Sequence, residues 1–150
     1  MEDSAALASA PEPTRPPGDV ALCDLVGEVV ARSTWLDGRL TVLLPAPGAL
    51  VDADPERLTL ALLSLLRGAA VYERAGGRVE FRVFRERDAW RFEVAGEPTR
   101  QESVFAPLHR EARAAFAPAR EVAEAEGGSA GIEHWPGEAA TFWLRLPKQL

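Results

Sequence analysis

The residues that carry most protein chemistry are scarce in this chain of 150 residues. Cys23 is the sole cysteine, which excludes a disulfide framework, a zinc finger and an iron–sulfur site. The two histidines, His109 and His134, have no partners at metal-ligand spacing. The chain contains no asparagine, so no such amide can serve as a metal ligand, and it lacks the motifs of a nucleophilic serine or a phosphate-loop lysine. Arginines, acids, hydroxyls and aromatic rings are the side chains that remain for chemistry.

The composition narrows the class of protein. The hydrophobic fraction of 47% is normal for a folded chain, and the length fits one domain. The 23 acidic residues outnumber the 17 basic ones, which gives a net charge of −6, the opposite sign to that of most nucleic-acid binders. The sequence has no run of about 18 apolar residues and no signal-peptide pattern. We therefore expect a cytoplasmic domain with no nucleic-acid partner and no direct membrane contact.

Two helices are indicated in the first half of the chain. The first has an apolar face at helical spacing, and we expect Asp19 to be its N-cap. The second opens with Asp54, Pro55 and Glu56, which supply an N-cap, a first-position proline and an acid in the first turn. Its wide apolar stripe continues to about Tyr72, which predicts deep burial of this helix.

A third helix is predicted over residues 116–126, with Pro118 in its first turn and Gly127–Gly128 ending it. The preceding segment, residues 96–115, carries many charges without a strong period, and we interpret it as a loop or mobile segment. Residues 1–18 hold four prolines among small residues, which is typical of an extended linker.

The apolar segments between these helices predict strands. Alternation of apolar and polar residues, or short apolar runs between turn residues, marks Leu40–Leu44, Val79–Val83, Trp90–Val94, Ser129–Trp135 and Ala139–Leu146. The order of elements predicts an α/β fold, a two-layer sandwich of about three helices on a mixed, mostly antiparallel sheet.

Several local phrases, taken with this order, resemble the ATP-binding catalytic domain of sensor histidine kinases, a member of the GHKL superfamily with the Bergerat-type ATPase fold. The matching stretches are Asp19–Val26, Val51–Leu58, Val104–Arg110, Gly127–Gly128 and Pro136–Pro147. The resemblance covers nearly the whole chain and implies that residues 19–150 form the ATP-binding domain. It also implies that residues 1–18 are the end of a dimerisation helix with its linker, the other interpretation being a native disordered N-terminus.

The resemblance implies a magnesium-holding helix in the stretch from Leu63 to Tyr72. The family's two asparagine places fall on Ser64 and Gly68, so Ser64 is the one candidate metal ligand that remains. Tyr72 is the candidate for stacking on adenine, and Arg67 is a further candidate nucleotide contact in the same stretch. Two of the family's ligands for ATP and magnesium are therefore replaced.

The adenine-binding and lid stretches depart from the family pattern as well. The place of the adenine-binding aspartate falls on Ala95, followed by Gly96, and Glu97 is the candidate replacement acceptor. Every glycine place of the lid is filled by another residue, so Arg110 and Arg113 are the candidates to neutralise a triphosphate. As an alternative, all of these charged residues are ordinary solvated side chains.

Three functions follow from the resemblance. One is an active kinase domain that uses ATP and Mg²⁺, phosphorylates a histidine on kinase dimerisation helices and feeds a response regulator. Another is a pseudokinase or adaptor that binds a response regulator or a kinase without ATP, and a regulatory binder of the anti-sigma type is a third interpretation. Loss of an adenine acceptor and a metal ligand removes roughly 3–6 of the about 8 kcal/mol of a micromolar site, which predicts millimolar or weaker binding unless other residues replace them.

Overall fold

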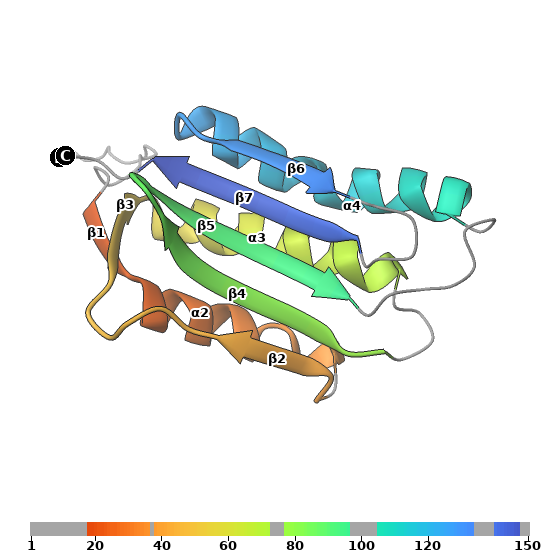
Figure 1. Ribbon diagram of the computed structural model, residues 1–150, viewed down its shortest axis with the longest axis horizontal. Coiled ribbons are helices and arrows are strands. Elements are labelled where there is room, and N and C mark those ends of the chain that lie inside the picture. Colours follow the sequence, from red (N-terminus) through yellow and green to blue (C-terminus); the bar gives the residue numbers. More distant parts are fainter. Residues whose placement is uncertain (1–17, 37, 73–76, 97–104, 134–139, 148–150) are drawn as a thin grey trace, which may run out of the picture.

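The computed structural model describes residues 18–36, 38–72, 77–96, 105–133 and 140–147. Helices α2 (Leu22–Ala31), α3 (Pro55–Tyr72) and α4 (Phe105–Ala125) lie on one face of a five-stranded sheet (Figure 1). That sheet contains, in spatial order, β2 (Leu40–Leu43), β4 (Val79–Glu86), β5 (Ala89–Gly96), β7 (Thr141–Pro147) and β6 (Ser129–Glu133). A short 3-10 helix η1 (Thr34–Leu36) follows α2, and a two-stranded sheet joins β1 (Gly18–Ala21) to β3 (Leu50–Ala53).

The pairing of the strands confirms the predicted fold class. β2 runs parallel to β4, while β4–β5, β5–β7 and β6–β7 are antiparallel. The β4–β5 hairpin places Val83 opposite Phe92 and turns at Arg87, whose φ is 56°. The protein is thus a two-layer α/β sandwich on a mixed, mostly antiparallel sheet.

The core lies between the helices and the inner face of the sheet. Phe81, Phe92 and Phe142 come from three neighbouring strands, and all three are fully buried. The alternating residues Arg82, Arg91 and Glu93 lie on the other face. Within the described segments, no helix combines the length and the apolar content needed to cross a membrane.

The start of α3 agrees with the prediction from its sequence. The Asp54 carboxylate accepts hydrogen bonds from the backbone N–H groups of Glu56 at 3.0 Å and Arg57 at 3.2 Å. Pro55 occupies the first helical position, where a missing N–H costs nothing. Local capping chemistry is therefore sufficient to set this boundary.

The end of α4 also agrees with the prediction. Gly127 has a φ of 80°, and its N–H donates to the Glu124 carbonyl. The Gly128 N–H donates to the Ala123 carbonyl at 2.8 Å, which completes a Schellman motif. At Gly128 the chain passes so close to β7 that a Cβ atom there would lie 2.0 Å from the Arg145 carbonyl oxygen. Glycine is therefore required at this turn for a steric reason.

The predicted start of the first helix is wrong. α2 begins at Leu22, its N-cap is Ala21, and no side chain caps it. Asp19 instead lies in β1, where it is paired with Asp52 of β3. These two strands were missed because they pair across about thirty residues of sequence, and neither carries a local period that would mark it.

The predicted loop over residues 96–115 is wrong for its second half, since α4 begins at Phe105. The helix contains many alanines, which have the highest helix propensity. Its buried side is made by small residues and one ring at helical spacing, Ala112, Phe116, Ala119 and Ala123, so its apolar period is faint in the sequence. Pro118 lies inside the helix on an exposed side, rather than in the first turn.

The remaining predictions on secondary structure agree to within a few residues where the structure describes them. β6 ends at Glu133 and β7 begins at Thr141. The predicted linker over residues 1–18 is wrong at its last residue, since Gly18 begins β1 and is paired with Ala53. The rest of that linker, the predicted turn at Pro136–Gly137 and the segment 97–104 lie outside the described residues.

Candidate functional site

The two residues at the metal-holding places lie on buried sides of α3. Ser64 is 2% exposed, and its hydroxyl donates to the Leu60 carbonyl of the same helix at 3.1 Å. Gly68 lies one turn further on and faces β7 and α4. A Cβ atom on Gly68 would lie 2.8 Å from a ring carbon of Phe142 and 3.4 Å from the Ala112 carbonyl oxygen. There is no space for a longer side chain beside Gly68.

Helix α4 covers this part of α3. Ala112 is fully buried and Phe116 is 3% exposed, and both belong to the stretch Glu111–Phe116 that matches the lid of the family. The rings of Phe116 and Phe142 meet edge to face, with their centroids 5.8 Å apart and their planes at 64°. An aromatic pair and the backbone of α4 therefore fill the space next to Gly68.

The three candidate arginines do not converge on one place. Arg67 lines a pocket with Arg32, which caps the end of α2, and Trp35 of η1. Arg113 lines a different pocket, between α4 and β6. Arg110 is exposed on α4.

The adenine-binding places lie at the end of β5. Ala95 is paired with Glu80 on one side and Thr141 on the other, and Gly96 is paired with Val79. The Ala95 side chain is a methyl group and offers no hydrogen-bond acceptor. Glu97 and the side chain of Tyr72 lie outside the described residues.

No family model matches the chain, and no curated protein matches it. Solved structures do match. They include the histidine kinase domain of the E. coli osmosensor EnvZ, with TM-score 0.69 and 15% identity, covering 92% of each chain. The ATP binding domain of PrrB from Mycobacterium tuberculosis matches with TM-score 0.66 and 21% identity, covering 91% of this chain and 100% of that one. A histidine kinase from Burkholderia phymatum matches with TM-score 0.69 and 23% identity, covering 89% and 72% of the respective chains.

The chain has the fold of a histidine kinase catalytic domain. The side chains that the structure describes can be compared with the ligands that a complex of ATP and magnesium requires. Magnesium requires oxygen ligands in tight octahedral geometry. The Ser64 hydroxyl is engaged by its own helix, Gly68 has no side chain, and no group of three or more His, Cys, Asp or Glu residues in the described part of the chain could hold a metal ion. The described residues of this histidine kinase fold do not fit a magnesium–nucleotide complex beside α3.

Phe142 and Ala112, which occupy the space beside Gly68, were not predicted from the sequence. Gly68 itself was the available signal. A glycine inside a helix costs about 1 kcal/mol relative to alanine, and such a residue usually has a packing or functional reason. The contact with the Phe142 ring is that reason here.

Proposed function

We propose that this chain is a pseudokinase domain, a histidine kinase fold that acts in the cytoplasm by binding a response regulator or the dimerisation helices of a kinase, without using ATP. One observation carries the proposal. The side of α3 that would hold magnesium is packed against Phe142 and α4, so closely that Gly68 could not carry a Cβ atom without a shift of the ring.

The packing also sets an energetic cost for nucleotide entry. A triphosphate beside Ser64 and Gly68 would require α4 to separate from α3 and expose Ala112 and Phe116, which are buried. Exposing one phenylalanine costs about 1.5–3 kcal/mol. Each 1.4 kcal/mol weakens apparent affinity about tenfold. This cost adds to the loss of the adenine acceptor and the metal ligand, so nucleotide binding is expected to be weaker than millimolar.

The alternative is an active kinase domain that binds ATP and Mg²⁺ through replacement residues. Arg110 and Arg113 support it, because both are exposed on α4 and have no fixed role in the core. Tyr72 and Glu97 are the candidates for adenine. The two functions differ in one measurable property, the affinity for nucleotide.

Calorimetric titration decides between them. The chain is titrated with ADP and with a non-hydrolysable ATP analogue, each with and without magnesium. No binding heat at about millimolar nucleotide is the expected result. A micromolar dissociation constant would overturn the proposal, and Tyr72→Ala and Arg113→Gln would then locate the site. Cooperative urea unfolding of the same sample shows that a silent titration is not due to unfolded protein.

A further inference from the structure

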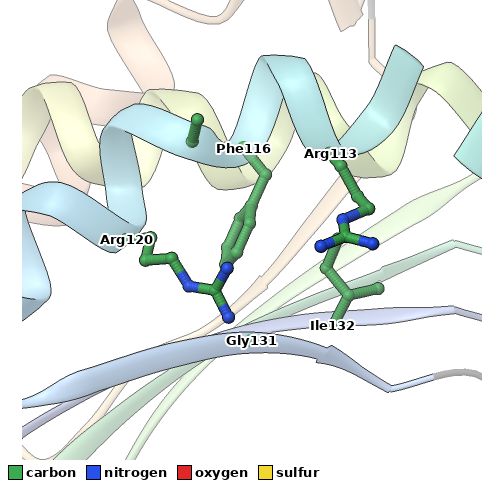
Figure 2. Close-up of a pocket in the computed structure, with 6 residues that line it drawn as sticks. Arg113, Phe116, Arg120, Gly131 and Ile132 are labelled. Carbon is green, nitrogen blue, oxygen red and sulfur yellow. The ribbon is translucent and has the colours of Figure 1, made fainter. Parts of the chain in front are cut away.

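A pocket of about 360 Å³ lies between α4 and β6. Figure 2 shows the side chains of Arg113 and Arg120 reaching from the helix towards the strand, with Phe116 between them. The lining residues are Arg113, Phe116, Ala117, Arg120, Gly131 and Ile132. The pocket thus combines two positive charges with an apolar wall and the backbone of a strand.

Neither guanidinium in this pocket has an acidic partner among the residues that the structure describes. Glu124 lies one helical turn from Arg120, but no ion pair joins them. The arginines on the outer face of the sheet differ, because Arg91 is paired with Glu93 and Arg145 with Glu86. Two unpaired guanidinium groups facing one small pocket favour an anionic occupant, and guanidinium binds carboxylates in a bidentate manner.

The strand below these arginines is an edge strand. β6 pairs with β7, and no other described strand lies on its other side. An edge strand presents unpaired backbone N–H and C=O groups, which can pair with an added extended segment. Because β6 ends one side of the sheet, such a segment would lie beneath α4, next to Gly131 and Ile132.

We propose that an extended acidic segment of a partner protein adds to the free edge of β6 and is held there by Arg113 and Arg120. The two arginines are seven residues apart, which is about 10.5 Å along a helix. Side chains on one face of an extended chain repeat about every 6.8 Å, so acids two residues apart can each reach one flexible guanidinium. This surface belongs to the proposed adaptor role and therefore rests on the proposed function.

The free edge of β6 favours a peptide over a free small anion. Phe116 is 3% exposed and offers a ligand almost no surface, and Ile132 is half-buried, so the apolar wall contributes little to binding. An extended segment uses both the charges and the edge, since the carboxylates on one of its faces meet the arginines and its backbone pairs with β6, whereas a free phosphate can use the charges alone.

The test uses fluorescence polarisation of a labelled nine-residue probe with Glu at alternate positions and Val or Thr between them. We expect saturable binding below about 1 mM. The double variant Arg113→Gln with Arg120→Gln should weaken it at least about tenfold. Arg67→Gln removes the same charge from an exposed arginine in another pocket and should leave binding unchanged. The same probe with Gln in place of Glu should not bind.

Backbone pairing is tested by two N-methylated probes, each blocked along one edge of the peptide strand. At least one of them should bind about tenfold more weakly than the parent. If both bind as tightly as the parent while inorganic phosphate displaces it, the pocket is a simple anion site and the strand addition is overturned. Absence of saturation, equal binding of the Gln probe, or full binding by the double variant also overturns it. Nucleotide binding in the calorimetric experiment would instead contradict the adaptor role and leave these outcomes unaffected.

Discussion

Gly68 lies where α3 packs against the Phe142 ring and the backbone of α4. Two opposing effects act on a side chain added there. Alanine is a better helix former than glycine by about 1 kcal/mol. Its methyl group would, however, meet the Phe142 ring at 2.8 Å. The sign of the change in the free energy of unfolding at this position therefore shows how closely α3 packs against α4 and β7.

We expect Gly68→Ala to destabilise the protein by about 1–3 kcal/mol despite the gain in helix propensity, because overpacking forces the ring to shift. Gly27→Ala is the matched control. Gly27 lies in α2, and a Cβ atom there would have nothing within 4 Å. That variant should gain about 0.5–1 kcal/mol. Urea unfolding measures both values, and a stabilising Gly68→Ala would contradict the closed packing.

A second prediction concerns the buried acid on the outer face of the sheet. Glu93 is 7% exposed and accepts hydrogen bonds from Arg91, at 2.5 Å, and from Arg82. Arg91 in turn lies 4.7 Å from the centre of the Trp143 ring. Loss of the Glu93 charge leaves the largely buried Arg91 guanidinium with only the more distant carboxylates of Glu86 and Glu133, each 3.9 Å away. Glu93→Gln should therefore cost about 1–3 kcal/mol.

The control for Glu93 lies in the same network. Glu80 is 3.6 Å from Arg82, and both side chains are nearly half exposed. Exposed pairs of this kind contribute little, so Glu80→Gln should change the free energy of unfolding by less than about 0.5 kcal/mol. Equal effects of the two substitutions in thermal or urea unfolding would show that burial of Glu93 does not increase the contribution of its ion pairs to stability.

At the scale of elements, boundaries set by local chemistry could be predicted and those set by distant partners could not. The start of α3 follows from Asp54 and Pro55, and the end of α4 follows from Gly127, because capping acts within a few residues. The strands β1 and β3 exist through their mutual pairing. The first half of α4 was missed because its buried residues are mostly alanines. For the same reason the closure of α3 by α4 could not be predicted.

Helix α4 contains a proline in its interior, and this gives a prediction for the element as a whole. Pro118 cannot donate to the carbonyl one turn earlier, and its ring crowds that carbonyl. We expect Pro118→Ala to stabilise the protein by about 1–3 kcal/mol. Pro55→Ala, at the first position of α3, removes no penalty and should be neutral or slightly destabilising. Urea midpoints compare the two, and an unchanged midpoint for Pro118→Ala would mean that the helix bends to accommodate the ring.

At the scale of the whole molecule, Glu126 just after α4 interacts electrostatically with charged residues at the start of α3 and in β3. Partial burial raises the pKa of the Glu126 carboxyl above its ordinary value. Arg57 lowers the pKa, while Asp54 and Asp52 add to the rise. The folded protein therefore keeps this proton to a higher pH than the unfolded chain, and stability falls as the pH rises from about 4.3, the unfolded value, through the folded pKa.

Glu126→Gln mimics the protonated acid and removes this pH-dependent loss. We expect the variant to gain stability over the parent protein at pH 7 and to lose that gain below about pH 4, where the acid is protonated in both states. Urea unfolding at the two pH values measures the difference. Glu124→Gln, at an exposed position two residues earlier, controls for the change in net charge. A gain for Glu126→Gln that is the same at both pH values would contradict the linkage.

The turn at Gly128 has a consequence for the genetics of this protein. Any missense codon there places a Cβ atom 2.0 Å from the Arg145 carbonyl oxygen, so either the turn or β7 must move. A mutant chain would spend more time unfolded, where cellular proteases remove it. A screen for loss of function should therefore return Gly128 repeatedly, although it touches no proposed ligand. Immunoblots would show a lowered amount of protein, whereas alleles of Arg113 and Arg120 should accumulate at normal levels.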